Sequence, residues 1–323
     1  MDAKPKATAE MVRQFEELFV NRRAYTVQSM KPHPESGRHY YYRPTATGTG
    51  APLALNGDTI RRHLEGEITI AVYAINPRTQ RSKWLAIDAD YRHALEDLLK
   101  LQCELRHDGI QAALEKSKRG AHLWVFFATP VLAGEARLYV LNLAARLTLP
   151  VKGVGWPEGI EVFPRQERLA EGEFGNAIRA PFGVHRGAGK RYWFYHADYT
   201  LESQFRYLAG LERVGEARLQ EVTAGMTIPS QFAPPAKKPD PPRPDRYSTG
   251  GEFRILDHVD VKRKSGRNYW TRCPSCAAAG HDTSGDNLAI SIEEPLKYKC
   301  WAGCTREMIR AALGRPIPVR RSA

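Results

Sequence analysis

The alternation of apolar and polar positions divides the first 227 residues into mixed helices and strands. Helical periodicity predicts helices over Ala7–Phe19, Tyr91–Arg106 and Glu135–Leu147. Short apolar runs predict strands over Glu67–Ile75, Trp84–Ile87, His122–Phe127, Glu161–Phe163 and Tyr192–Tyr195, and Ala112–Glu115 leads into a turn. Helices and strands mixed around one sheet predict an α+β or α/β core.

A proline-rich stretch over residues 228–250 interrupts this pattern. Its prolines stand at positions 229, 234, 235, 239, 241, 242 and 244. Because proline removes a backbone donor and fixes φ, we expect neither helix nor central strand there. The sequence therefore predicts a catalytic domain over residues 1–227, a semi-extended linker over 228–250 and a second domain over 251–323.

The charge balance favours a polyanionic partner. The chain carries 48 Lys and Arg against 36 Asp and Glu, a formal net charge of +12 at pH 7. Each phosphate that such a chain neutralises releases a counterion, although a basic soluble protein without nucleic acid has the same composition.

No apolar run approaches the roughly 20 residues that span a bilayer. Residues 1–13 are charged and lack a signal peptide's apolar core, so we expect a cytoplasmic protein without a membrane partner.

The five cysteines are unevenly distributed. Four lie between Cys273 and Cys304, whereas Cys103 stands alone in a predicted helix. Clustered cysteine pairs in a chain without a secretory signal indicate a metal site rather than disulfides. Cys103 has apolar neighbours, so we predict a buried, unreactive thiol.

An acidic motif, LAIDADYRH, follows a predicted strand. In an extended segment Asp88 and Asp90 project from the same face. Two such carboxylates repel each other unless a cation lies between them, and carboxylate oxygens suit Mg²⁺ or Mn²⁺. The alternative is a strand end with two solvated acids.

Two further motifs carry charged groups. In EKSKRGAHLWVFF a basic turn precedes His122 at the start of a strand, and its cations, hydroxyl and glycine suit a triphosphate. In GIEVFPRQERL a strand carries Glu161, and Arg165 follows Pro164. Glu161 would complete a set of three carboxylates. A basic surface turn and an ordinary surface glutamate are the alternatives.

The order of these motifs resembles the archaeo-eukaryotic primase superfamily, and most closely its small primase-polymerases from mobile elements and defence loci. The segments FEELFVNRRAY, IRRHLEGEITIAVYAI and FGNAIRAPFG also resemble that family, so the likeness covers about residues 10–200. Many members have aspartate at the third acidic position, where this chain has Glu161.

The resemblance implies an RRM-like catalytic half packed against a smaller α/β half. It implies that Asp88, Asp90 and Glu161 are catalytic and hold two divalent ions, Mg²⁺ or Mn²⁺. It also implies a site for the phosphates of a nucleoside triphosphate. The predicted nucleotide-binding residues are Ser117, Lys118, Arg119, His122, Arg165 and Arg179.

The C-terminal cysteines form two pairs, Cys273-x-x-Cys276 and Cys300-x-x-x-Cys304, on either side of a strand-like NLAISI segment. Paired thiolates at this spacing predict one tetrahedral structural Zn²⁺, with His281 as an alternative to one cysteine. The residues CPSC, GHD, NLAIS and CWAGC resemble the zinc-binding domain of bacterial and phage primases, which precedes a different catalytic fold. We therefore predict a zinc-ribbon-like module whose metal supplies much of its folding energy.

Aromatic and basic residues surround these cysteines and favour binding of single-stranded nucleic acid. We predict a DNA primase or DNA-directed polymerase that makes primers on single-stranded DNA, or RNA, from nucleoside triphosphates. Two other hypotheses fit the sequence: a repair polymerase that only extends primers, and a non-catalytic nucleic-acid-binding subunit. The chain has no G-x-x-x-x-G-K-[ST] loop, so a helicase or another replication or defence protein would act as partner.

Overall fold

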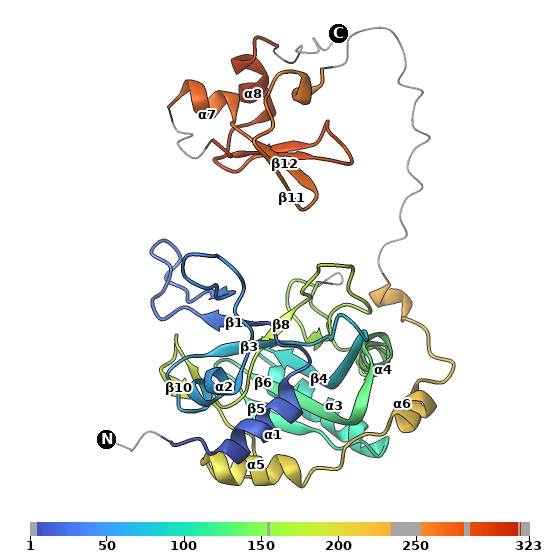
Figure 1. Ribbon diagram of the computed structural model, residues 1–323. Coiled ribbons are helices and arrows are strands. Elements are labelled where there is room, and N and C mark those ends of the chain that lie inside the picture. Colours follow the sequence, from blue (N-terminus) through green and yellow to red (C-terminus); the bar gives the residue numbers. More distant parts are fainter. Residues whose placement is uncertain (1–4, 154–155, 234–252, 281–284, 316, 318–323) are drawn as a thin grey trace. The chain divides into compact units, whose positions relative to one another are not determined.

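The computed structural model describes residues 5–153, 156–233, 253–280, 285–315 and 317. The chain divides into two compact units, residues 1–237 and 238–323, drawn from blue to yellow and from orange to red in Figure 1. Within the described residues, no helix has the length and apolar character needed to cross a membrane.

One antiparallel sheet of the first unit has the strand order β5-β6-β4-β7. Its elements, in chain order, are β4 (Arg81–Ala89), α3 (Ala94–His107), β5 (Ala113–Lys116), β6 (Ala121–Leu132), α4 (Ala133–Arg146) and β7 (Glu161–Phe163). This is a βαββαβ unit, so the RRM-like half predicted from the sequence is confirmed.

The residues of β4 show how this sheet separates two environments. Leu85, Ile87 and Ala89 belong to the core that includes α3 and α4. Trp84 and Ala86 alternate with them and belong to a second core on the opposite face. Asp88 continues that second row, so the face that carries it changes from apolar to charged towards the end of the strand.

A second antiparallel sheet has the order β2-β1-β3-β8. Its strands are β1 (Tyr25–Gln28), β2 (Tyr41–Tyr42), β3 (Ile70–Tyr73) and β8 (Ala177–Arg179), and a hairpin follows as β9 (Val184–His185) and β10 (Lys190–Arg191). The remaining helices of the unit are α1 (Ala9–Phe19), α2 (Gly57–Leu64), α5 (Leu201–Ala209), α6 (Glu216–Thr223) and the 3₁₀ helix η1 (Ser230–Phe232). Helices α1 and α5 lie side by side (Figure 1).

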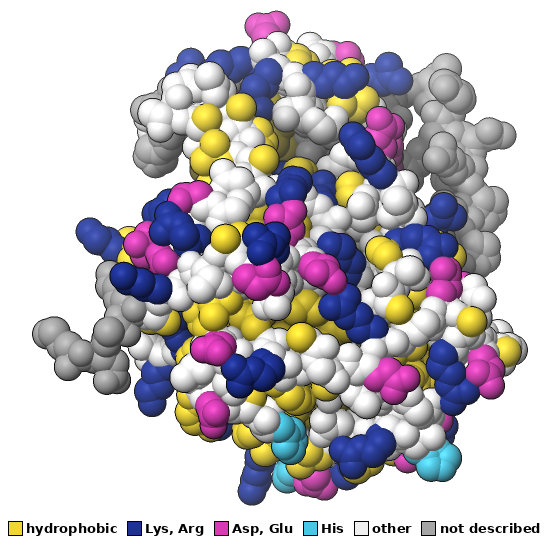
Figure 2. Space-filling view, turned by 60° about the horizontal axis from the view of Figure 1, so that its bottom comes forward, with side chains coloured by type: hydrophobic (Ala, Val, Ile, Leu, Met, Phe, Trp, Pro, Cys, Tyr) yellow, Lys and Arg dark blue, Asp and Glu magenta, His cyan; other side chains and the backbone are white. Residues whose placement is uncertain are grey.

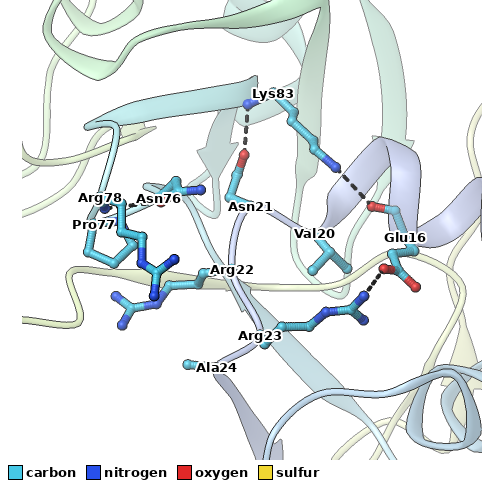
Figure 3. Close-up of a pocket in the computed structure, with 10 residues that line it drawn as sticks. All are labelled: Glu16, Val20, Asn21, Arg22, Arg23, Ala24, Asn76, Pro77, Arg78 and Lys83. Carbon is cyan, nitrogen blue, oxygen red and sulfur yellow. Dashed lines mark hydrogen bonds and ion pairs between the residues drawn. The ribbon is translucent and has the colours of Figure 1, made fainter.

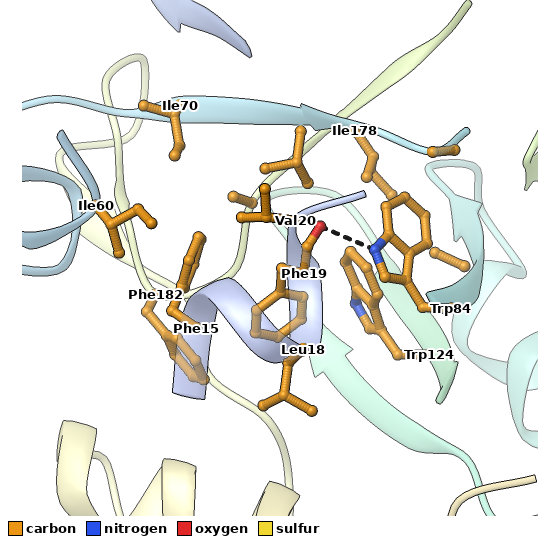
Figure 4. Close-up of a cluster of buried hydrophobic side chains, with 14 of the residues drawn as sticks. Phe15, Leu18, Phe19, Val20, Ile60, Ile70, Trp84, Trp124, Ile178 and Phe182 are labelled. Carbon is orange, nitrogen blue, oxygen red and sulfur yellow. Dashed lines mark hydrogen bonds between the residues drawn. The ribbon is translucent and has the colours of Figure 1, made fainter. Parts of the chain in front are cut away.

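A shared core joins the two sheets and α1. Phe19 packs edge-on against Trp124, with ring centroids 5.5 Å apart, and Trp84 donates its indole N–H to the Phe19 carbonyl over 3.0 Å (Figure 4). Burial of these large rings fixes β4 and β6 against α1. The charged end of the β4 row is thereby held on a rigid support.

The second unit is a small antiparallel sheet with two short helices. Its elements are η2 (Ile255–Asp257), β11 (Arg263–Ser265), β12 (Asn268–Thr271), α7 (Pro274–Ala278), β13 (Leu288–Ser291), β14 (Tyr298–Cys300) and α8 (Arg306–Ala312), with the strand order β11-β12-β13-β14. Its core consists of a few aliphatic side chains and cysteines. This sheet and its cysteine cluster agree with the predicted zinc-ribbon-like module.

Two local predictions for the first unit are wrong. Cys103 is exposed, because the buried stripe of α3 includes Leu98, Leu101 and Leu105 and position 103 lies about 200° around the helix from 101. The strand expected over Tyr192–Tyr195 is also wrong, since β10 ends at Arg191. In that range, among the described residues, only Phe194 forms a β-bridge, to Glu115.

The beginning of the proline-rich stretch contains the helix η1, contrary to expectation. None of its three residues is a proline, so the backbone donors of a helical turn are present. Phe232 is 4 % exposed and belongs to the core beneath α3 and α4. The first residues of the predicted linker are therefore part of the first unit, and residues 234–250 lie outside the described ranges.

Candidate active site and metal centre

Strand register aligns four ionisable side chains across the RRM-like sheet. Asp88 of β4 is paired with His122 of β6 on one side and with Glu161 of β7 on the other. His122 is in turn paired with Glu115 of β5. Directly paired residues of antiparallel strands share a face, so Glu115, His122, Asp88 and Glu161 form one row.

His122 lies between two carboxylates. Its Nδ1 is 2.8 Å from Glu115 Oε2 and its Nε2 is 3.3 Å from Asp88 Oδ1. Burial alone would lower the pKa of His122, but the Asp88 and Glu115 carboxylates outweigh it and raise the pKa to about 9. A protonated imidazole in this position donates from Nδ1 to Glu115 and places its positive charge beside Asp88.

Glu115, which the sequence reasoning did not select, anchors this arrangement. It is fully buried and accepts hydrogen bonds from His122, from Trp124 Nε1 (3.0 Å) and from Arg179 Nη2 (2.7 Å). Burial would raise the pKa of Glu115, but Arg179 and His122 lower it below its usual value. The sequence does contain a signal for a buried Glu115. It lies two positions after Ala113 and therefore on the same buried face of the strand.

We expect Glu115→Gln to lower the free energy of unfolding by about 3 kcal/mol, because it leaves the buried Arg179 without its counter-charge. Urea unfolding measures this difference. The matched control, Glu104→Gln, removes the partly exposed pair with Arg146, so its effect should stay below about 1 kcal/mol. Equal effects of the two substitutions would contradict the anchoring role of Glu115.

The turn between β5 and β6 is hydrogen-bonded to the carboxylate of Asp90. The Ser117 hydroxyl donates to Asp90 Oδ1 over 3.1 Å, and Arg119 Nη2 donates to Oδ2 over 2.7 Å. Burial would raise the pKa of Asp90, but Arg119 and Ser117 lower it. A Cβ at Gly120 would lie 1.9 Å from the Ala89 carbonyl oxygen, so the close approach of turn and strand requires glycine. Lys118 of the same turn is exposed.

Glu161 has two cationic neighbours. Lys152 forms an ion pair with its carboxylate, and Arg165 Nη1 lies 3.7 Å from Oε2. The structure therefore brings Asp88, Glu161 and His122 into one row. Arg179 contacts that row through Glu115, and Asp90, Ser117 and Arg119 lie beside it. Lys152 was not selected from the sequence, because it lies in a loop outside the recognised motifs.

The acidic residues have the chemistry of a divalent-cation site. Asp88 Oδ1 is buried and accepts no hydrogen bond of good geometry, despite its proximity to His122. An unsatisfied buried carboxylate oxygen fits a cation ligand. The other two acids are held by Arg119 and Lys152, and the three carboxylates do not form a cluster within 4.8 Å among the described residues. The carboxylate oxygens fit a divalent ion. To bind it, Asp90 would have to release Arg119 and Glu161 would have to release Lys152.

The four cysteines of the second unit lie together. The Sγ atoms of Cys273, Cys276, Cys300 and Cys304 are all within 4.8 Å of one another, and Cys276 Sγ is 3.5 Å from that of Cys300 and 3.3 Å from that of Cys304. Zn–S bonds of about 2.3 Å place tetrahedral sulfurs about 3.8 Å apart, so the cluster fits zinc. His281, the alternative ligand, lies outside the described residues.

Comparison with known proteins identifies the first unit. The family model for the archaeo-eukaryotic primase domain of TOTE conflict systems matches residues 12–222, which is more than half of the chain. No curated protein matches the chain significantly.

Two solved structures share limited similarity with the chain. One is the catalytic domain of primase Repb' in complex with initiator DNA, with 10 % identity, a TM-score of 0.32 and coverage of 66 % of this chain and 93 % of that one. The other is the polymerase domain of Mycobacterium tuberculosis Ligase D in complex with DNA, with 11 % identity, a TM-score of 0.28 and coverage of 67 % and 88 %.

Proposed function

Because the chain belongs to the archaeo-eukaryotic primase family of TOTE conflict systems, we propose that it is a template-dependent nucleotidyltransferase that makes primers on single-stranded nucleic acid. Family membership supports a primase-type enzyme in general. The primer synthesis, the two divalent ions and the single-stranded template are our proposal. The alignment of Asp88 with His122 and Glu161 across three strands carries it.

Asp88, Asp90 and Glu161 would hold two divalent ions, Mg²⁺ or Mn²⁺, and Asp88 supplies the buried oxygen without a hydrogen bond. Bound there, the ions would lower the pKa of an attacking 3′-hydroxyl and neutralise charge at the α-phosphate. When Asp90 binds an ion, Arg119 would leave its present ion pair with Asp90 and bind a phosphate oxygen of the nucleotide instead.

The basic side chains around the row would bind the triphosphate. His122 is nearly buried and positively charged, so it offers a fixed hydrogen-bond donor beside the acids. Glu115 holds it and Arg179 in place. The remaining proposed contacts come from the edge of the site: Ser117, Lys118, Arg119 and Arg165. In nucleotidyl transfer such positioning and charge stabilisation account for most of the catalysis.

The second unit would bind the single-stranded template. Strand register places Arg263 opposite Trp270, Trp270 opposite Ala289, and Ala289 opposite Lys299, so these residues share one face. Trp301, two positions beyond Lys299, is 63 % exposed and stacks on Trp270 at 6.4 Å between centroids and 17° between planes. Arg263 and Lys299 lie over the two indoles. An exposed ring stacked on a half-buried one and flanked by cations suits stacking on unpaired bases with contacts to their phosphates.

We expect Trp301→Ala to weaken binding of a single-stranded oligonucleotide by about 1–3 kcal/mol, the contribution of one base–aromatic stack. Fluorescence anisotropy with a labelled oligonucleotide measures the loss. Tyr199→Ala, which removes a 71 % exposed ring from the first unit, serves as control and should bind normally. If both variants bind like the wild type, the tryptophan face is not the template site.

Synthesis with and without an annealed primer tests the proposed activity. Product on unprimed single-stranded DNA identifies a primase. Product only on primed template would identify the primer-extending repair polymerase instead. A protein that binds single strands tightly and yields no product in either reaction would be the non-catalytic subunit, for which a helicase or other replication or defence protein would be the active partner.

A further inference from the structure

An open pocket of about 540 Å³ lies between the C-terminal end of α1 and the turn that joins β3 to β4 (Figure 3). It is separate from the aligned acids, since Lys83 lines it and stands five positions before Asp88 on β4, about 16 Å along the strand. The charged residues that form its walls are Glu16, Arg22, Arg23, Arg78 and Lys83.

The charge of this pocket is unbalanced. Four cationic side chains and one carboxylate line it. Glu16 contacts two of the cations. Its carboxylate forms an ion pair with Arg23, and its backbone carbonyl oxygen accepts a hydrogen bond from Lys83 Nζ over 3.2 Å. In the part of the chain that the structure describes, the Arg78 guanidinium has no hydrogen bond or ion pair. By contrast, on the face drawn in Figure 2, basic side chains mingle with acidic ones.

Arg22 connects the pocket to an aromatic surface. Its guanidinium donates to the carbonyls of Glu173 and Phe174 and lies 4.7 Å from the centre of the Phe174 ring. Arg43 lies 4.0 Å from the centre of the same ring. Neither arginine has a carboxylate partner among the described residues, so the positive charge extends beyond the pocket along Phe174.

The second sheet connects this region to the candidate active site. Tyr73, which packs against Phe174 at 5.6 Å, is paired with Ala177 of β8, and Ala71 is paired with Arg179. Residues two apart on a strand share a face, so Tyr73 and Arg179 lie on the same side of the second sheet. Arg179 is the residue that contacts Glu115. Tyr73, Ala71 and the side chain of Arg179 are buried, so this row joins the two places through packed side chains, and the accessible cations lie at its pocket end.

We propose that this pocket binds a backbone phosphate of a single nucleic-acid strand that passes along Arg22, Phe174 and Arg43. The proposal rests on the proposed function, because a polymerase must guide a strand past its acids. A phosphate could also come from a free nucleoside triphosphate, but the cations here are spread along an open surface rather than gathered in one turn. A strand with phosphates at regular intervals matches that spread better.

Binding of a labelled single-stranded 20-mer to the full chain, without added divalent ions, tests the proposal at several salt concentrations. We expect Arg78→Glu to weaken binding on the order of tenfold and Arg78→Ala on the order of threefold, independently of sequence. The slope of log K against log salt should lose about 0.7 for the phosphate contact removed. Arg106→Glu, on the exposed side of α3, should leave affinity and slope unchanged.

Two results would overturn the proposal. One is wild-type affinity and salt slope for both Arg78 variants. The other is a loss of labelled triphosphate binding in Arg78→Glu with unchanged strand binding, which would make the pocket a nucleotide site. Because this assay involves no catalysis, an inactive protein with the expected Arg78 effect would contradict the proposed polymerase function and leave the strand site standing.

Discussion

Replacing Asp88 with asparagine is expected to reduce nucleotide incorporation on the order of a thousandfold. Asparagine preserves the shape of the side chain but removes the negative charge that would hold a divalent ion, and loss of a transition-state electrostatic contact has this magnitude. Steady-state incorporation of a labelled nucleotide on a primed template measures the change in kcat/KM.

Asp58→Asn is the matched control for this substitution. Asp58 lies in the first turn of α2, and its side chain is 60 % exposed. We expect normal activity from this variant. The central role of Asp88 would be contradicted if Asp88→Asn kept more than a tenth of wild-type activity while its urea unfolding matched that of the wild type.

Replacing Cys276 with serine is expected to abolish zinc binding and unfold the second unit. The core of this unit contains only a few aliphatic side chains, and structural zinc contributes on the order of 10 kcal/mol to the folding of such modules. Metal analysis should find zinc in the wild type and none in the variant. Limited proteolysis should cut within residues 253–315 and spare residues 5–233.

Cys103→Ser is the control for thiol chemistry in general. Cys103 is exposed on α3 and lies outside the cysteine cluster, so zinc content and proteolysis should not change. A Cys276→Ser protein that retained zinc, or that resisted proteolysis as the wild type does, would show that the four cysteines do not form a structural metal site.

The sequence predicted the long, strongly patterned elements best. The helix predicted over Ala7–Phe19 is observed as Ala9–Phe19, and the helix predicted over Tyr91–Arg106 is observed as Ala94–His107. The strands β1, β2 and β8 were missed because they are short and their pairing depends on partners distant in the chain. Local pattern contains little information about such pairing.

The candidate site was predictable where a motif marked it. Asp88 and His122 came from motifs, and the structure places them in register. Glu115 was missed because it ends an apolar run, and only the fold shows that Arg179 reaches it from another sheet. Lys152 was missed because its contact with Glu161 depends on a loop. Burial, charge pairing and loop contacts are tertiary properties that spacing does not encode.

Primer synthesis on unprimed single-stranded DNA is the most direct measurement of the proposed function. Wild-type protein is incubated with labelled nucleoside triphosphates and Mg²⁺ or Mn²⁺ beside the Asp88→Ala/Asp90→Ala double variant. We expect new oligonucleotides from the wild type and none from the variant, because the aligned acids would hold the ions. Equal product from both proteins, or none from the wild type with single-strand binding intact, would contradict the proposed function.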